Sequence, residues 1–299
     1  MTATAIPTAA EKRRAFAAQI RGGHFITAPG IYDMISARVA DRMGFDCLYM
    51  TGFGTVASLL GLPDAGLATY SQMVERVERF AQGTRTPFVA DADTGYGGLL
   101  NVAHTVRGYE AAGAAGIQLE DQEFPKKCGH TPGRRVIAMA DMVRKIQVAA
   151  DARSDPDFLI VARTDARSAL GLPEALRRAE AYRRAGADIL FVESPESEAE
   201  METIGGRLDA PLLANMVEGG ATPMLSPDRL REIGYRMAIY PGCGFMAATA
   251  ALAGIYGALR ANGTTNGAHT PLYPFREMTG LMGFEDVWAF ERKWAEPGA

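Results

Sequence analysis

One short unit recurs along this chain: a helical stretch ends at glycine, a short apolar strand follows, and the strand ends at a polar residue. Residues 109–120 and 182–193 are two copies, each with glycine where a helix needs a left-handed cap and glutamate at the carboxyl end of the strand. Residues 43–50 and 233–240 repeat the same order. Strands that alternate with helices in this way predict a parallel sheet.

Eight strands are expected, all of them continuous apolar runs typical of strands buried on both faces: 25–28, 47–50, 87–90, 116–119, 158–162, 189–192, 211–214 and 237–240. Helices are expected between the strands, at 71–81, 101–112, 140–150, 173–185 and 227–233. Eight such units favour an α/β fold of the (β/α)₈ barrel type over an open doubly wound sheet.

No linker marks a second domain, so we expect a single barrel domain over residues 1–299 that includes a helical extension from about 247 to 299. Within the extension, helices are expected at 247–261 and 285–295, around a polar loop at 262–269. We expect this extension to pack on the barrel or on a neighbouring subunit.

Charge and cysteine content limit the class of partner. The net charge is −4 and no basic block stands out, which argues against nucleic acid. No apolar run was found that approaches the roughly 18 residues of a membrane span, so no membrane partner is expected. The three cysteines, Cys47, Cys128 and Cys243, fit neither a disulfide framework nor a four-ligand zinc site. Together with an N-terminus that lacks a signal pattern, they predict a cytoplasmic location.

The active site of a barrel lies at the carboxyl ends of its strands. Polar or functional residues follow most of the expected strands: Tyr49, Thr51, Gly52 and Phe53 after the second, Asp91 and Asp93 after the third, Glu120 and Asp121 after the fourth, Arg163 and Asp165 after the fifth, Glu193 after the sixth, and Asn215 and Glu218 after the seventh. The loop after the second strand adds Asp64.

Four of these acids, Asp64, Asp91, Asp93 and Glu120, are expected to converge with little to neutralise them. Clustered carboxylates are unstable unless a cation lies among them, and oxygen ligands favour Mg²⁺ over zinc. The alternative is that Asp91 and Asp93 cap the next helix or close a turn.

Cys128 lies between Lys127 and Gly129, beside His130, on the loop after the fourth strand. Neighbouring cations lower the pKa of a thiol and make it a usable acid or nucleophile. The alternative is a buried apolar residue, which is the interpretation for Cys47 and Cys243. Lys126 is either part of a charge clamp or a solvated surface lysine.

Arg163 ends an apolar strand, where a guanidinium needs a carboxylate partner. Either a substrate carboxylate or the side chain of Glu193 would supply it. The other histidines, His24, His104 and His269, have no flanking chemistry and are treated as structural or exposed.

Five segments together resemble the isocitrate lyase/phosphoenolpyruvate mutase superfamily: 91–97, 120–122, 126–130, 162–166 and 213–220. The resemblance runs from about residue 26 to 260, and the Lys-x-Cys-Gly-His motif at 126–130 is specific to the superfamily. It implies a barrel that exchanges a terminal helix between subunits, and hence a homotetramer built as a dimer of dimers.

The resemblance also implies roles for single residues. Magnesium, with Mn²⁺ as a possible substitute, would be held at Asp91, with Asp64, Asp93 and Glu120 acting largely through water. A 2-oxo acid would be bound by residues from several strand ends and from the lid: Tyr49, Thr51, Gly52, Phe53, Asp91, Gly129, Arg163 and Asn215. Glu193 would orient Arg163 and His130, and residues 126–130 would form a lid over the substrate.

Within the superfamily, Cys-Gly-His at 128–130 resembles the carbon–carbon lyases, and the chain lacks the large insertions of isocitrate lyases proper. It is most similar to short lyases acting on 2-methylisocitrate, 2,3-dimethylmalate or related 2-hydroxy dicarboxylates. Carboxyphosphonoenolpyruvate mutases share the same motif, and segments 213–220 and 238–241 resemble theirs. A phosphonomutase therefore stays an alternative, and a non-enzymatic barrel that binds an oxo acid is a third.

The lyase hypothesis implies a reverse aldol reaction on a small carboxylate substrate. Tyr49 is the candidate base for the 2-hydroxyl group, and pyruvate or another 2-oxo acid is one product. Lys126, His130 and Arg163 would offset the charge of the departing enolate, and Cys128 would protonate it. Residues near Phe53, Phe124 and 242–245 would contact the substituents on C3 of the substrate.

Overall fold

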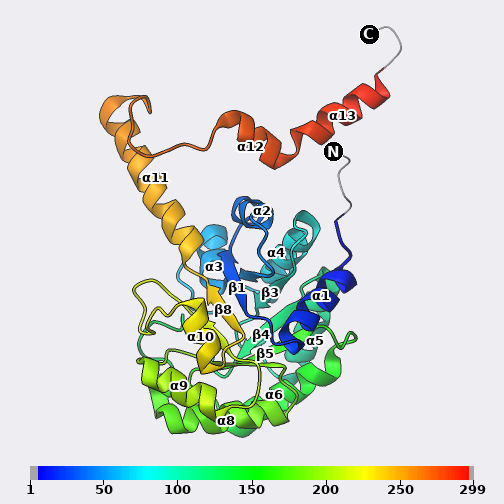
Figure 1. Cartoon of the computed structure of the whole chain (residues 1–299), viewed down its shortest axis with the longest axis vertical. Helices are drawn as coiled ribbons and strands as arrows, with labels where there is room; N and C mark the ends of the chain where they lie inside the picture. The colour runs from blue at the N-terminus through cyan, green and yellow to red at the C-terminus, as the bar shows by residue number, and fades with distance from the viewer. Residues whose placement is uncertain (1–5, 296–299) are drawn as a thin grey trace. The chain divides into compact units, whose positions relative to one another are not determined.

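The structure is a computed structural model that describes residues 6–295. Eight parallel strands form one nearly closed barrel in the order β6-β5-β4-β3-β2-β1-β8-β7 (Figure 1). A single parallel bridge between Leu190 and Leu212 links the remaining neighbours, β6 and β7. The strands are β1 (Ile26–Ile31), β2 (Leu48–Met50), β3 (Phe88–Asp91), β4 (Gly116–Glu120), β5 (Leu159–Thr164), β6 (Ile189–Val192), β7 (Leu213–Asn215) and β8 (Met237–Tyr240). The predicted (β/α)₈ barrel is confirmed.

Helices separate the strands along the chain, as the repeating unit predicts. In the barrel they are α1 (Ala9–Arg21), α2 (Met34–Arg42), α3 (Gly52–Leu60), α4 (Tyr70–Gly83), α5 (Leu99–Ala112), α6 (Met139–Ala152), α7 (Ala166–Leu170), α8 (Leu172–Arg184), α9 (Glu198–Arg207) and α10 (Pro227–Ile233). All five helices expected between strands are present as α4, α5, α6, α8 and α10. The sequence analysis did not anticipate α1, α2, α3, α7 and α9.

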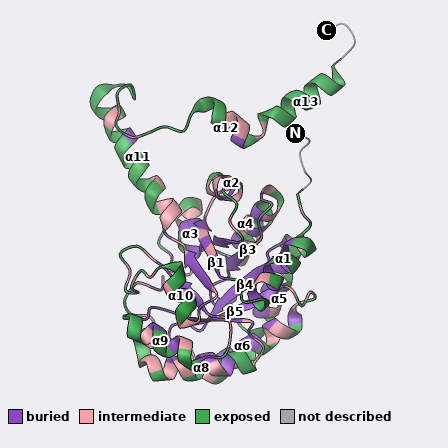
Figure 2. Cartoon of the chain, in the orientation of Figure 1, coloured by how far each residue is buried: buried purple, intermediate pink, exposed green. Residues whose placement is uncertain are grey.

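Side chains alternate along the strands between two hydrophobic clusters. Tyr49 and Val89 point into the barrel interior, whereas Leu48, Met50 and Ala90 belong to the layer between the strands and the outer helices. Figure 2 shows that the strands of the barrel are coloured mostly as buried. The alternation follows from the period of two in a strand, and it leaves the strand ends free to present polar side chains.

Helix α1 closes the end of the barrel where the strands begin. Phe16, Ala17 and Ile20 belong to the same cluster as the inward-facing strand residues. Lys12 Nζ donates to the carbonyl oxygens of Ala81, at 2.8 Å, and Thr84, at 2.5 Å. A capping box at Thr8 and Glu11 fixes where the helix begins. The polar strand ends therefore lie at the opposite, open end of the barrel.

The described chain divides into two compact units, Pro7–Phe245 and a second formed mainly by the residues from Met246 onward. The second unit contains most of α11 (Cys243–Asn262), then α12 (Phe275–Met282) and α13 (Phe284–Trp294). The helices expected in the extension are present as α11 and α13, and α12 was not expected. Its aromatic side chains are largely exposed, among them Phe275, Trp288 and Phe290.

By length and composition alone, α11 could cross a membrane: it has 20 residues, and its most apolar window has a mean hydropathy of 1.2. The expectation that no such run exists is therefore corrected. Its sequence is rich in alanine and glycine, whereas leucine, isoleucine, phenylalanine and valine are the residues that favour insertion most. One such helix is weak evidence for a membrane protein.

Candidate active site

The candidate site lies at the carboxyl ends of the strands, where the sequence analysis placed it. Strands β2 to β7 and the segment between β4 and α6 contribute its side chains. That segment carries Lys126, Cys128, Gly129 and His130, and we call residues 126–135 the lid. The site therefore combines groups on rigid strand ends with groups on one loop.

Lys126 is buried and lies between two carboxylates. Its Nζ is 2.5 Å from Asp64 Oδ1 and 2.6 Å from Asp93 Oδ1, and the side chain is 2 % exposed. Burial alone would lower the pKa of Lys126, but the charges of Asp93, Glu120, Asp64 and Asp91 outweigh burial and raise it. Lys126 is thus part of a charge clamp, and the alternative of a solvated surface lysine is wrong.

The acids Asp91, Asp93 and Glu120 are buried, and burial raises the pKa of each, that of Asp93 to about 7. Asp91 Oδ1 accepts the backbone N–H of Asp93 at 3.0 Å, so the turn-closing alternative holds in part. The helix-capping alternative is wrong, because the residue at the N-cap of α5 is Gly98 rather than Asp91 or Asp93. Raised carboxylate pKa values indicate a site that gains from an added positive charge.

Two further observations test whether a hard cation fits. Glu120 Oε1 is buried without a hydrogen-bond partner. A Cβ built on Gly52 would lie 2.5 Å from Asp91 Oδ2, so glycine leaves the Asp91 carboxylate open on that side. Among residues 6–295, however, no three acidic, histidine or cysteine side chains already converge at metal-binding distance. The carboxylates suit Mg²⁺ by chemistry, with Lys126 neutralising two of them in this arrangement.

Tyr49 is fully enclosed in the barrel. Its hydroxyl donates to Gln118 Oε1 at 2.8 Å, and Gln118 Nε2 donates to Asp91 Oδ1 at 3.4 Å. Burial, followed by the charge of Asp91, raises the pKa of Tyr49 well above that of a free phenol. The phenol is thus a hydrogen-bond donor in this arrangement. Sequence analysis missed Gln118 because it lies within β4 rather than at the strand's end.

Arg163 is paired with several carboxylates rather than one. Its Nε and Nη2 each lie 2.9 Å from Asp165, and the guanidinium is 3.3 Å from Glu193 Oε2 and 3.5 Å from Glu120 Oε2. Burial would lower the pKa of Arg163, and the surrounding carboxylates raise it. The predicted Glu193 partner is confirmed. The main partner is Asp165, whose role the sequence analysis left open.

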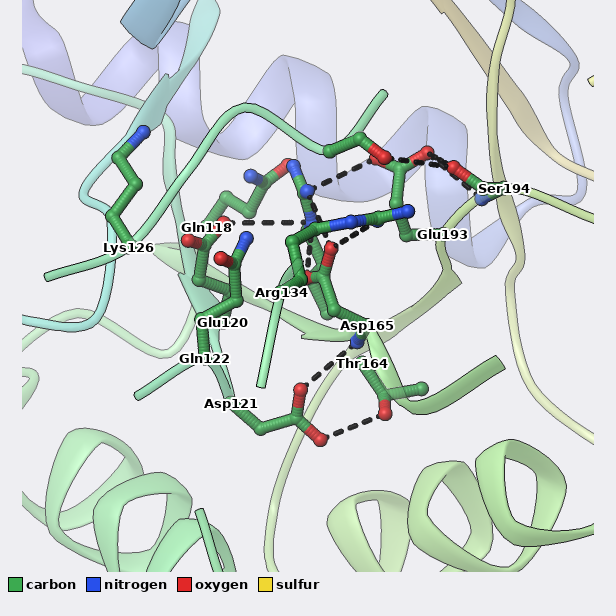
Figure 3. A network of polar contacts seen from close by, with 12 residues as sticks. Gln118, Glu120, Asp121, Gln122, Lys126, Arg134, Thr164, Asp165, Glu193 and Ser194 are labelled. Carbon is green, nitrogen blue, oxygen red and sulfur yellow. Dashed lines mark hydrogen bonds and ion pairs between the residues drawn. The ribbon is translucent and has the colours of Figure 1, made fainter. Parts of the chain in front are cut away.

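Asp165 also binds the lid. Arg134 Nη1 donates to Asp165 Oδ1 at 2.8 Å, so one carboxylate holds both Arg163 and Arg134 (Figure 3). Asp121 lies beneath this pair and accepts the backbone N–H of Asp165 at 2.9 Å and the hydroxyl of Thr164 at 2.7 Å. Asp121 therefore supports the site without pointing into it.

The rest of the lid is fixed by β6 and β7. The Ser194 hydroxyl donates to the carbonyl of Gly129 at 2.9 Å, and Asn215 Nδ2 lies 3.2 Å from His130 Nε2 and 3.1 Å from Glu193 Oε2. Asn215 Oδ1 is buried without a partner, which leaves an acceptor for a ligand. His130 lies 3.5 Å from Glu193, but burial outweighs that charge and lowers the pKa of His130.

The Cys128 thiol, which is part of the lid, is half-buried, and burial raises its pKa. The expectation that neighbouring cations lower it is corrected: Lys127 Nζ instead donates to the carbonyl of Gly133, at 3.3 Å. A thiol that keeps its proton suits an acid better than a nucleophile.

The remaining predicted residues divide between two places. Thr51 and Gly52 begin α3 at the site, and the rings of Phe53 and Phe245 are 5.1 Å apart there. Phe124 is 68 % exposed and packs on Gly66, beside a separate cavity.

Known proteins resemble this chain over most of its length. The family model of phosphoenolpyruvate phosphomutase matches residues 16–259. A 2,3-dimethylmalate lyase of Eubacterium barkeri is 48% identical over 90% of this chain and 93% of its own. A 2-methylisocitrate lyase of Aeropyrum pernix is 43% identical over 91% of this chain and 86% of its own. A solved oxaloacetate acetylhydrolase with the inhibitor 3,3-difluorooxalacetate superposes with a TM-score of 0.90 at 33% identity, over 97% of this chain and 99% of that one.

The chain therefore belongs to the phosphoenolpyruvate phosphomutase family, within the isocitrate lyase/phosphoenolpyruvate mutase superfamily. It is an enzyme of the carbon–carbon lyase type found in that superfamily.

Proposed function

We propose that the enzyme is a Mg²⁺-dependent lyase that cleaves a 2-hydroxy dicarboxylate of the 2,3-dimethylmalate or 2-methylisocitrate type into a 2-oxo acid, such as pyruvate, and a second carboxylic acid. The observation that carries the proposal is the Cys128 thiol, kept protonated by burial on a lid next to a dense cluster of charges. The high identity to two lyases with such substrates in their names supports the substrate class.

The barrel residues bind and orient the substrate. Arg163, buried at the site, is the group for a substrate carboxylate, and the unpartnered Asn215 Oδ1 is an acceptor for a donor such as the 2-hydroxyl group of the substrate. The Tyr49 hydroxyl donates its single proton to Gln118, so towards the substrate its oxygen can only accept, and Tyr49 stays the proposed base for the 2-hydroxyl group. When bound at Asp91, with Asp64, Asp93 and Glu120 around it, Mg²⁺ or Mn²⁺ supplies Lewis-acid polarisation of substrate oxygens.

The lid residues act on the fragment that leaves. The 2-hydroxyl proton passes to the base, for which the phenolate form of Tyr49 is proposed. Cleavage of the C2–C3 bond then leaves negative charge on a carboxylate-stabilised enolate. Lys126 and Arg163 offset that charge as cations, and His130, whose pKa is lowered, stabilises it by donating a hydrogen bond. Glu193 orients His130 and Arg163. Cys128 then transfers its proton to the carbon of the enolate, and the closed lid excludes water that would compete.

The test is Cys128→Ala assayed for 2-oxo acid release from a panel of 2-hydroxy dicarboxylates with Mg²⁺. A general acid is worth about 10²–10⁴ in rate, so we expect kcat to fall by that factor. Cys47→Ala, at a buried thiol that the proposed site does not use, is the matched control and should keep the parent rate in folded protein. Turnover of Cys128→Ala within about threefold of the parent would remove the thiol from the mechanism.

The alternative is a phosphonomutase, because carboxyphosphonoenolpyruvate mutases share the Cys-Gly-His motif and the matching family model is that of phosphoenolpyruvate phosphomutase. It needs the same enolate stabilisation. Release of no 2-oxo acid from any dicarboxylate, with a shift in the phosphorus NMR spectrum of a phosphonate substrate, would support the mutase instead.

A homotetramer, a dimer of dimers in which C-terminal helices are exchanged, is also proposed for this enzyme, together with a cytoplasmic location. The exposed aromatic side chains of α12 and α13 support association, because exposed apolar patches mark interaction surfaces. Native mass spectrometry of the full chain and of a chain ending at Asn262 tests this proposal. The full chain should form a tetramer, and the shortened chain should form an assembly with fewer subunits. A monomeric full chain would contradict it.

A further inference from the structure

A second cavity lies outside the rim that holds the candidate active site. Its volume is about 590 Å³, which is in the range of small-molecule sites. The loop after β3, the loop that leads into α4, the beginnings of α4 and α5, residues between β4 and α6, and one residue of α6 form its walls. Neither Cys128, Arg163 nor Tyr49 lines it. A ligand there would not occupy the position of the proposed substrate.

The charge of this cavity is positive. Lys145 of α6 lines it, and no aspartate or glutamate of the described chain does. Lys145 Nζ donates to the carbonyl of Thr94 at 2.8 Å and makes no ion pair with any residue in the part of the chain that the structure describes. An ammonium carries three donors, so two are left for a ligand. Burial lowers the pKa of Lys145, and the charges of Asp141 and Glu120 oppose that effect.

Part of the cavity wall is aromatic. The rings of Tyr70 and His104 are 4.5 Å apart, and those of Tyr70 and Tyr96 are 6.0 Å apart. The exposed ring of Phe124 lines the cavity as well. Aromatic faces and edges at these distances suit a planar apolar group, which gains by stacking as well as by leaving water.

We propose that this cavity binds a small carboxylate with a planar apolar body, its carboxylate at Lys145 and its flat face against Tyr70, Tyr96 and His104. A cation is disfavoured because no acid lines the walls. A phosphate dianion is disfavoured because only one cationic side chain of the described chain, and no arginine, is present.

The cavity borders two loops of the candidate active site. Lys145 holds the carbonyl of Thr94, the residue next to Asp93, and a bound carboxylate would compete for that donor. Gln122 also lines the cavity, and its amide is bonded to both the N–H and the carbonyl of Lys127, at 2.9 and 2.8 Å. A ligand in the cavity would therefore alter the hydrogen bonds that hold the loop carrying Asp93 and Thr94 and those that hold Lys127 at the start of the lid.

The experiment is a titration of the full chain with benzoate, followed by NMR of protein labelled at histidine Cε1. The chain has 4 histidines, of which His104 lines the cavity and His130 lies in the candidate active site. We expect the His104 signal, assigned with His104→Gln, to shift with saturation, and any shift of the His130 signal to be smaller and to follow the same saturation curve. Turnover is not measured, so failure of the proposed function would leave this test intact.

Two variants and one neutral analogue sharpen the titration. Lys145→Met should weaken benzoate binding by about tenfold or more, since a hydrogen bond to a charged group is worth about 1.5–3 kcal/mol. Arg144→Met removes an exposed charge from the same helix and should change affinity by less than about twofold. Benzamide, which lacks the charge, should not shift His104 in the parent protein.

The proposal is overturned by any of three results: a shift of His130 alone, an affinity that Lys145→Met leaves unchanged, or equal binding of benzamide and benzoate. If Lys145→Met fails to fold, the benzamide comparison on the parent protein decides the matter alone. No shift of any histidine signal at millimolar benzoate would also reject the site.

Discussion

Cys128 shows how burial decides the chemistry of one side chain. Its pKa is raised, so at any given pH a smaller fraction is thiolate than for a free thiol, and the fraction grows tenfold per pH unit until the pKa is reached. We predict that alkylation of Cys128 by iodoacetamide rises through pH 9 without levelling off. Peptide mass spectrometry measures the rate, and the same peptide in urea-unfolded protein is the control. A plateau near neutral pH would show a stabilised thiolate and contradict the acid role.

Arg134 is the second residue with a specific prediction. It shares Asp165 with Arg163, so it links the lid to the group that would bind the substrate carboxylate. We expect Arg134→Gln to raise KM about tenfold, the scale of a lost charged hydrogen bond, with a smaller change in kcat. Arg134→Lys should restore part of the loss.

Arg135 supplies the matched control for this steady-state measurement. It is adjacent in sequence but pairs with Glu123 in solvent, at 2.6 Å. Arg135→Gln should leave KM within about twofold of the parent. Equal effects of the two substitutions would show that loss of charge, rather than the contact with Asp165, changes KM.

At the scale of residues, sequence analysis recovered groups that stand next to a strand end or in a compact motif. Lys126, Arg163 and Glu193 are where it expected them. It missed Gln118 and Arg134, because each reaches its partner across strands or from a distant part of the lid. It also assigned the wrong direction to the pKa of Cys128, since charged neighbours in sequence say nothing about burial.

The lid is the element on which the site depends most. A Cβ built on Gly129 would lie 2.3 Å from Arg163 Nη2 and 2.7 Å from Glu193 Oε2, both buried. Gly129→Ala should therefore prevent the lid from closing and lower kcat/KM on the order of 10²-fold, the cost of a displacement of about 1 Å. Steady-state kinetics checks this.

Gly206→Ala is the control for that substitution, because nothing lies within 4 Å of a Cβ built at Gly206 in α9. It should leave kcat/KM at the parent value. Full activity of Gly129→Ala would mean that the lid tolerates a different path over Arg163.

Element prediction was most accurate where a compact apolar run or a clear helical pattern marks the element. The strands β6 and β8 match their expected bounds, because each is a compact buried run. Helix α9 was missed because Gly205 and Gly206 weaken a helical pattern. The structure gives the reason for Gly205: an added Cβ would lie 2.1 Å from the carbonyl of Ile233 in α10. The packing of α9 against α10 requires glycine at this position, and a local stretch of sequence does not reveal that contact.

At the scale of the whole molecule, α1 closes one end of the barrel and the site occupies the other. Phe16 is fully buried in the interior cluster. Phe16→Ala should lower the free energy of unfolding by about 3–5 kcal/mol while leaving kcat/KM unchanged at temperatures where the variant is folded. Urea denaturation and kinetics measure the two quantities.

Met43→Ala, at a position that is 68 % exposed, is the control and should change stability by less than about 0.5 kcal/mol. A loss of activity in Phe16→Ala that matches its loss of stability, in protein still folded, would show that the two ends of the barrel are coupled.

The end of the barrel that α1 closes is separate from the candidate active site, and this separation affects how the enzyme can evolve. We expect mutations around Lys12 and Phe16 to change thermal stability. Mutations at the carboxyl ends of the strands should instead change substrate specificity. Directed evolution could therefore first raise the stability of the barrel through mutations near α1. The added stability would then tolerate destabilising mutations at the strand ends that change substrate specificity.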